Sequence, residues 1–273
     1  VEYWTGHLKE ALEHANRILA RDPGNTTARS VRERIEAASR PWWVKGDYTV
    51  DTFSDDRDAG QETTLSLTRR TPVGSAIVRG SYAQRFGRDD QLVEFEFYPR
   101  FRPGTYAFLG AGFSGGDGLY PHARYSFDLY QSLGRGFEAS GGARYLDFGN
   151  GTEIYVATLS KYVGNWMLTA KVSHIPAAGD LDSTTYQGGF RRYFGSDGTS
   201  YVGVNYSHGL SKQEVRSIFD LVSVNSDTVR GELDQLIGTR VRLSIAGSTS
   251  RQERPVLLPF WQTTFTAGLA VQF

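Results

Sequence analysis

The chain ends with the stretch WQTTFTAGLAVQF, residues Trp261–Phe273, and this stretch decides the fold. Apolar and polar residues alternate along it: counted back from the end, one set contains Phe273, Val271, Leu269, Ala267, Phe265, Thr263 and Trp261. The residues between them are Gln, Ala, Gly and Thr. Because successive side chains of a β-strand point to opposite faces, the pattern predicts a strand with one apolar and one polar face. Most soluble domains end instead in poorly ordered residues.

The same two-residue period continues through the whole chain after Pro41. Alternating segments are separated by clusters of Gly, Asp, Asn and Pro, which is typical of an antiparallel meander. We therefore predict fourteen strands, at residues 42–54, 61–71, 75–86, 91–102, 105–115, 122–132, 137–148, 152–163, 166–176, 183–194, 200–209, 227–238, 240–250 and 260–273. The stretch 210–226 could hold a short helix or a folded loop, which leaves twelve and sixteen strands as alternatives.

Composition narrows the class of protein. The chain has 273 residues, 39% of them hydrophobic, and its 30 basic and 30 acidic residues cancel. Nucleic-acid-binding proteins usually carry a basic excess, so we expect no nucleic-acid partner. The chain has no cysteine, which excludes a disulfide framework and a thiolate metal site. The acidic clusters at Asp55, Asp56 and Asp58 and at Asp89 and Asp90 do not match a calcium-binding loop, so we expect no metal and no cofactor.

The two faces of the predicted strands differ in chemistry. Leu, Val, Phe and Tyr occupy one parity, and charged residues of both signs occupy the other. Fourteen strands enclose more space than apolar side chains fill, so we expect the apolar face to meet lipid and the charged face to line a hydrated lumen. Closure also pairs every backbone group, as lipid requires. The predicted fold is therefore all-β, a closed antiparallel transmembrane β-barrel of about 14 strands.

The lengths of the connections predict the orientation of this barrel. Links after even-numbered strands, such as residues 72–74 and 103–104, are short, whereas links after odd-numbered strands, such as 54–60, 87–90 and 210–226, are longer and polar. Outer-membrane barrels have short turns in the periplasm and longer loops outside. We therefore expect the outer membrane of a Gram-negative bacterium, with both termini periplasmic and with outer-membrane lipid and lipopolysaccharide around the barrel.

Parity and position give the candidate site residues. The charges expected in the lumen are Arg79, Glu94, Glu96, Arg124, Asp128, Glu138, Arg144, Arg191, Arg230, Glu232, Asp234 and Arg242. The lumen aromatics are Tyr98, Tyr130, Tyr155, Tyr193 and Tyr201, and inward tyrosines that only fill space between the charges are the alternative. A membrane girdle is predicted at Trp42, Trp43, Trp166 and Trp261, because these residues lie near strand ends.

The first forty residues have a different period. Apolar residues recur every three or four positions on both sides of the break Asp22-Pro23-Gly24-Asn25, which predicts two helices, the second capped by Thr26 or Thr27. Their spacing resembles part of a tetratricopeptide repeat, and a plain helical hairpin fits equally well. We therefore predict a short periplasmic helical segment at 1–40, with a tetratricopeptide-like pattern, followed by the barrel at 41–273.

Three stretches carry a resemblance to a known family: EALEHANRILARDPGN in the helical segment, PWWVKGDY at the first strand, and FTAGLAVQF at the last. The chain resembles the YaiO-type outer-membrane barrels, in which a short tetratricopeptide-like segment precedes a barrel. The terminal strand, with Phe273, Val271, Leu269 and Phe265, is similar to the signal that such barrels present to the barrel assembly machinery. Related architectures, in which periplasmic helices are fused to a barrel, export exopolysaccharides.

The resemblance and the mixed lumen imply three functional hypotheses. The first is a conduit for a polar solute, most simply a saccharide polymer for export, with periplasmic proteins bound by the N-terminal helices. The second is a non-conducting structural barrel or surface receptor, whose lumen is plugged by pairs between its charges. The third is a barrel enzyme, which needs a nucleophile and a base. Because His122, His174 and His208 lie near strand ends, with His174 and His208 on the apolar parity, we expect no catalytic residues and no enzyme.

Overall fold

The computed structural model describes residues 8–55, 57–116, 118–149, 151–176, 183–195, 198–209, 225–253 and 258–273. It contains the helices α1 (Leu8–Arg21) and α2 (Thr26–Ala38). The strands are β1 (Trp42–Phe53), β2 (Gly60–Thr71), β3 (Gly74–Arg85), β4 (Arg88–Arg102), β5 (Thr105–Ser114), β6 (Ala123–Gly134), β7 (Phe137–Asp147), β8 (Gly151–Val163), β9 (Trp166–Ile175), β10 (Ser183–Phe194), β11 (Ser200–His208), β12 (Asn225–Ile237), β13 (Val241–Glu253) and β14 (Phe260–Gln272).

The two helices form a short hairpin. α1 ends before Pro23, and the side chain of Asn25 accepts a hydrogen bond of 2.9 Å from the backbone N–H of Ala28. Asn25 therefore caps α2 one residue earlier than the predicted Thr26, because its side-chain oxygen reaches the first turn of the helix. Ala15 and Ile35 are among the buried apolar residues of the pair. The likeness of this segment to a tetratricopeptide repeat stays a prediction.

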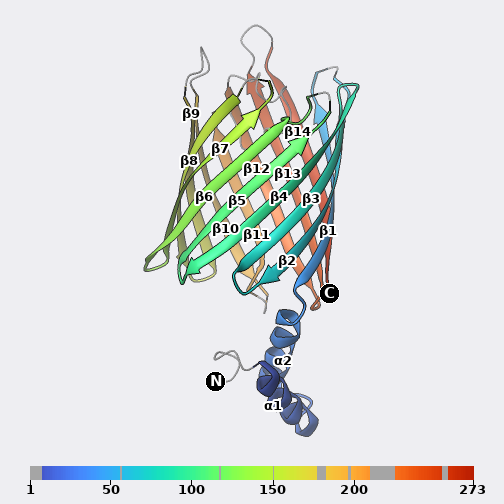
Figure 1. Ribbon diagram of the computed structural model, residues 1–273, viewed down its shortest axis with the longest axis vertical. Helices are drawn as coiled ribbons and strands as arrows, with labels where there is room; N and C mark the ends of the chain where they lie inside the picture. The colour runs from blue at the N-terminus through green and yellow to red at the C-terminus, as the bar shows by residue number, and fades with distance from the viewer. Residues whose placement is uncertain are drawn as a thin grey trace.

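The fourteen strands form one closed antiparallel barrel, as the alternation predicts (Figure 1). Each strand pairs with its neighbours in sequence, and β14 closes the sheet against β1. The closing seam extends to the last residue, because Trp42 and Phe273 exchange backbone hydrogen bonds of 3.2 and 3.0 Å. The alternative counts of twelve and sixteen strands are wrong. Most of the stretch 210–226 that prompted them lies outside the described residues, and β12 begins at Asn225.

The two ends of the barrel differ in their connections. We call the end that carries the helices and the C-terminus the turn end, which is the lower end in Figure 1, and the opposite end the loop end. Tight turns join β2 to β3, β4 to β5, β6 to β7 and β8 to β9 at the turn end. One of them needs glycine: Gly136 has φ +78°, and a Cβ there would lie 2.5 Å from the carbonyl oxygen of Tyr162.

One connection at the loop end is shorter than predicted. β3 and β4 are joined only by Phe86 and Gly87, with φ 56° and 72°, whereas the sequence suggested a longer loop over 87–90. Positive φ at both central residues is the geometry of a two-residue hairpin turn. Asp89 and Asp90 are therefore strand residues, paired with Gln84 and Ala83.

The exposure of successive residues alternates where a strand has one apolar outer face and a packed inner face. On β4, Val93 and Phe95 are 47% and 51% exposed, whereas Leu92 and Glu94 between them are 2% and 5% exposed. The outer wall of the barrel is thus apolar, and the inner wall holds the polar set. The last strand follows the same rule, since Phe265, Leu269, Val271 and Phe273 all lie outside. No described helix combines the length and the apolar character needed to span a membrane.

Candidate functional site: the barrel lumen

All twelve predicted lumen charges lie at inward positions of their strands. Most of them pair. Arg79 lies 2.8 Å from Glu96 and 3.5 Å from Glu94, and Arg191 lies 2.8 Å from Glu232. The other ion pairs are Arg124 with Glu94, Arg144 with Asp128, and Arg242 with Asp234. Paired charges keep the wall hydrophilic while each charge is partly neutralised.

Inward glycines allow some of these pairs to form across an intervening strand. Glu94 on β4 reaches Arg124 on β6 over Gly112 of β5, where an added Cβ would lie 3.0 and 3.2 Å from their side-chain carbons. Gly203 of β11 stands in the same way between Arg191 and Glu232. Sequence reasoning missed this arrangement, because residues two strands apart have no fixed spacing in the chain.

Aromatic side chains line the inner wall near the turn end. Four of the five predicted lumen tyrosines lie there, and the structure adds Tyr106, Phe108 and Tyr162. We call this set the aromatic strip: Tyr98, Tyr106, Phe108, Tyr130, Tyr162, Tyr193 and Tyr201. Each member lies within four residues of the turn-end terminus of its strand. The three additions were identifiable from parity in the sequence, since each follows the alternation of its own strand.

The members of the aromatic strip contact one another and the charges beside them. Tyr106 and Tyr130 stack with ring centroids 4.5 Å apart, and Tyr193 and Tyr201 lie 5.7 Å apart. The hydroxyl of Tyr106 donates to Glu138 at 3.3 Å, and the Arg191 guanidinium lies 4.4 Å from the Tyr201 ring. The strip therefore places aromatic ring faces next to a carboxylate and a guanidinium, which can both form hydrogen bonds.

The prediction for Tyr155 is wrong. This residue is 50% exposed on the outer wall, where its hydroxyl donates to Glu153 at 2.8 Å. The inward positions beside it belong to Ile154 and Val156, which pack in a small buried cluster near the loop end with Leu146. Apolar residues occupy both faces of β8 here, so parity alone could not assign its tyrosine.

The girdle prediction is wrong for Trp43. Trp42, Trp166 and Trp261 lie on the outer wall, but Trp43 points inward and is 9% exposed. Adjacent residues of one strand face opposite sides, so Trp42 and Trp43 could not both meet lipid.

Three outward aromatic residues at the turn end have a cation over the ring from the neighbouring strand. Arg69 lies over Trp42 at 5.1 Å and Arg192 over Trp166 at 5.5 Å, and both are directly opposite pairs in the sheet. Lys161 lies over Phe137 in the same way, at 3.9 Å. Such amphipathic pairs suit the headgroup layer of a membrane.

The loop end of the lumen is narrowed by the connection between β5 and β6. Leu119 and Tyr120 are 1% and 2% exposed and pack on the inward residues Ala83 and Leu92. Asp90 holds this connection, since its carboxylate accepts hydrogen bonds of 2.7 Å from the Ser114 hydroxyl and 2.9 Å from the Tyr120 N–H.

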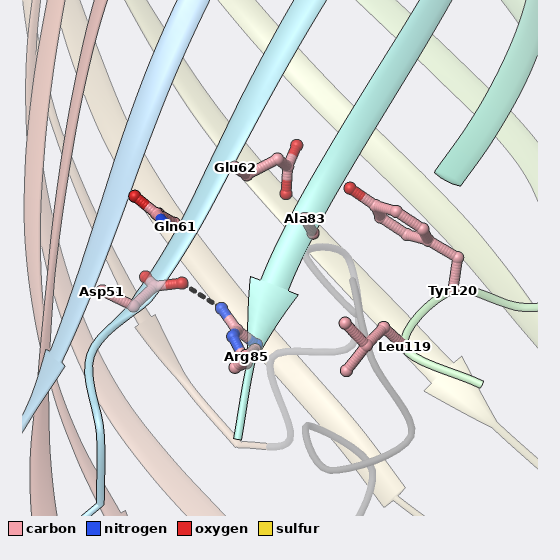
Figure 2. Close-up of a pocket in the computed structure, with 7 residues that line it drawn as sticks. All are labelled: Asp51, Gln61, Glu62, Ala83, Arg85, Leu119 and Tyr120. Atoms are coloured by element: carbon pink, nitrogen blue, oxygen red, sulfur yellow. Dashed lines mark hydrogen bonds and ion pairs between the residues drawn. The ribbon is translucent and has the colours of Figure 1, made fainter. Parts of the chain in front are cut away.

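A pocket lies beside this inward connection. It is lined by Asp51, Gln61, Glu62, Ala83, Arg85, Leu119 and Tyr120. Figure 2 shows Arg85 of β3 reaching Asp51 of β1, with Leu119 and Tyr120 approaching from the connection. The loop end is thus a polar constriction bridged by an ion pair.

Two of the histidines considered as catalytic candidates, His174 and His208, have contacts on the outer wall and not in the lumen. His174 and His208 lie on the outer wall near the loop end, where His174 contacts Thr184 at 3.1 Å and His208 contacts Asp227 at 2.8 Å. Within the described residues, no three His, Asp or Glu side chains are placed to hold a metal ion.

A closed antiparallel barrel with an apolar outer wall and a charged lumen has the architecture of an outer-membrane β-barrel. The family model described as the YaiO membrane beta barrel domain matches residues 44–214. The chain belongs to this family, and it is a protein of the outer membrane.

Solved structures share the fold at low sequence identity. The CymD monoaromatic hydrocarbon channel has a TM-score of 0.56 and 9% identity, over 89% of this chain and 91% of that one. A bacterial polysaccharide outer membrane secretin has a TM-score of 0.53 and 5% identity, over 86% and 99%. Acinetobacter baumannii Omp33 has a TM-score of 0.51 and 11% identity, over 86% and 98%. No curated protein matches the sequence.

Proposed function

We propose that this protein is a conduit for a polar solute across the outer membrane, and that the solute is a saccharide polymer moving outward. The observation that carries the proposal is the aromatic strip. Its rings lie inside the barrel on β4, β5, β6, β8, β10 and β11, whereas outer-wall aromatics meet lipid.

The chemistry of the strip suits a sugar chain. A pyranose ring has apolar C–H faces and a polar edge of hydroxyl groups, so it pairs with a side chain that has an apolar body and a polar tip. Tyr106 and Tyr130 present stacked rings, and Glu138 lies beside them to accept hydrogen bonds. Several weak contacts of this kind hold a polymer without trapping it. The fold is also shared with a polysaccharide secretin, which agrees with the proposal.

We propose that the turn end faces the periplasm. Short turns on that side are the rule for outer-membrane barrels, and the helices lie at the same end. A polymer would then meet the aromatic strip before the constriction at Leu119 and Tyr120. The helices would offer a surface to periplasmic proteins at the mouth, which pull-down with and without residues 1–40 would test.

Oligosaccharide flux into proteoliposomes tests the proposed function. The wild-type protein should admit a neutral oligosaccharide faster than a polyethylene glycol of equal size. Tyr106→Ala should reduce that preference about threefold to tenfold, as expected when one ring contact is lost. Tyr155→Ala is the matched control, because it removes an equal ring from the outer wall. Equal rates for the saccharide and the glycol in all three proteins would contradict the proposal.

A second candidate is a non-conducting structural barrel or surface receptor. The observation that favours it is the inward connection, in which Leu119, Tyr120 and the Asp51–Arg85 pair occupy the loop end of the lumen. A barrel closed there would present its loops to the outside and pass nothing. For a non-conducting barrel, the flux assay should show correctly folded protein and no flux of any solute.

We also propose that the exposed apolar side chains of the last strand, Phe265, Leu269, Val271 and Phe273, are recognised by the barrel assembly machinery. Deleting Phe273 should lower the amount of folded barrel in the outer membrane, and an unchanged amount would contradict this role.

A further inference from the structure

The turn-end mouth of the lumen has three arginines and a tryptophan that the conduit proposal does not use. We call it the mouth cluster: Trp43 of β1, Arg70 of β2, Arg100 of β4 and Arg242 of β13. Each is at an inward position within two residues of the turn-end terminus of its strand. The Trp43 ring lies 5.7 Å from the Arg70 guanidinium and 5.9 Å from that of Arg242, so it joins the two cations along the wall.

The charge in the mouth cluster is only partly balanced. Arg242 pairs with Asp234. Arg70 lies close enough to Arg242 and Arg100 for their positive charges to act on it. Like charges that share one stretch of inner wall repel each other. A bound anion would relieve this repulsion.

The mouth cluster adjoins the aromatic strip. Arg100 is paired with Tyr106 across β4 and β5, and Arg70 and Tyr98 are both paired with Ser75 of β3. Arginine and tyrosine therefore alternate along one stretch of inner wall. A ligand that fits both must have ring faces for the tyrosines and anionic groups for the arginines. A guanidinium binds a planar carboxylate through two parallel hydrogen bonds.

We infer that the lumen selects an anionic saccharide, whose uronic-acid carboxylates bind Arg70 and Arg100 while its rings lie on the aromatic strip. This inference rests on the proposed function, and it names the substrate class. The mouth cluster raises the local concentration of the anionic polymer at the turn end, and the strip then guides it inward. High salt weakens the binding, because the arginines are open to solvent and their charge is screened.

Calorimetric titration of the full-length protein in detergent tests the inference. The ligands are a mannuronic acid oligosaccharide and a neutral mannose oligosaccharide of the same length. At low salt the wild-type protein should bind the acidic oligosaccharide at least about tenfold more tightly, and Arg70→Gln should remove most of that difference. The matched control is Arg69→Gln, which removes the same charge one residue away on the outer wall.

Equal affinity for the two oligosaccharides, or equal losses in Arg70→Gln and Arg69→Gln, would overturn the inference. A shift on boiling in a gel establishes that each variant is folded. Because the titration needs no transport, it separates the two proposals: a protein that binds the acidic oligosaccharide selectively but shows no flux keeps the anionic site and contradicts the conduit.

Discussion

At the residue scale, the packing of charged side chains on the inner wall depends on glycines, which leave room beside them. Gly141 and Gly142 are neighbours on β7 and face opposite sides of the barrel. A Cβ on Gly142 would lie 2.1 Å from both Asp128 Oδ1 and the Phe127 carbonyl oxygen, whereas a Cβ on Gly141 meets nothing within 4 Å. Gly142 thus makes room for the Asp128 side chain that pairs with Arg144.

This contrast predicts the effect of alanine at the two positions. Gly142→Ala should destabilise the folded barrel by about 1–3 kcal/mol, because the added methyl group displaces backbone as well as the ion pair. Gly141→Ala should be neutral or slightly stabilising, because it adds a small apolar group to the outer wall and restricts the unfolded chain. Urea unfolding in detergent measures both, and equal effects would contradict the assignment of faces.

The same scale shows where residue-level prediction from sequence succeeds and fails. Alternation predicted the inward positions of Arg79, Glu94 and Glu96 on β3 and β4, because their outward neighbours Val78, Val93 and Phe95 are apolar. It failed at Tyr155, where Ile154 and Val156 put apolar residues on the inner face as well. It also failed at Trp43, because the preference of tryptophan for the headgroup layer was applied to two adjacent residues.

At the element scale, the connection between β5 and β6 is a described element that enters the lumen at the loop end. Asp90 fixes it through the Ser114 hydroxyl and the Tyr120 N–H, and Asp90 is itself 2% exposed. Buried hydrogen bonds to a carboxylate contribute about 1.5–3 kcal/mol each, so one side chain supplies much of the anchoring.

Asp90→Ala should therefore release the connection from the inner wall. We expect faster protease cleavage between residues 115 and 122, and a larger unit conductance if the connection obstructs the lumen. Asp89→Ala is the control, because Asp89 is exposed and its contact is a 3.5 Å hydrogen bond from the Tyr82 hydroxyl. Identical cleavage in the two variants would show that Asp90 is not the anchor.

The element boundaries were largely predictable from the period of the sequence. β2, β8 and β9 begin and end within one residue of the predicted bounds, because Gly and Pro mark their turns. The β3–β4 turn was misread, since polarity at Asp89 and Asp90 was interpreted as a loop although both residues pair in the sheet. The inward path of residues 118–121 could not be predicted, because these residues show no periodic pattern in the sequence.

At the scale of the whole molecule, the formal charges cancel, but the arrangement of the charged groups differs between the two ends. At the turn end, cations lie on both walls: Arg70, Arg100 and Arg242 inside, and Arg69, Lys161 and Arg192 outside. At the loop end, Asp51, Glu62 and Asp90 are inside, and Arg85 pairs there with Asp51. The total charge of the chain could not predict this arrangement, because the arrangement depends on which strand ends lie together at each end of the barrel.

Orientation in the membrane can be tested directly, because these 273 residues contain no cysteine. Asp58→Cys places a thiol at the loop end, and Val73→Cys places one in the turn between β2 and β3. On intact cells, an impermeant maleimide should label Asp58→Cys and spare Val73→Cys until the outer membrane is opened. Labelling of Val73→Cys alone on intact cells would reverse the proposed orientation.

Single-channel recording in planar bilayers tests the conduit most directly. The full-length protein, shown to be folded by its shift on boiling, should give discrete current steps, and a saccharide added on the turn-end side should interrupt them. Folded protein that inserts and gives no current steps, in the wild type and in Asp90→Ala alike, would contradict the conduit and favour the non-conducting barrel.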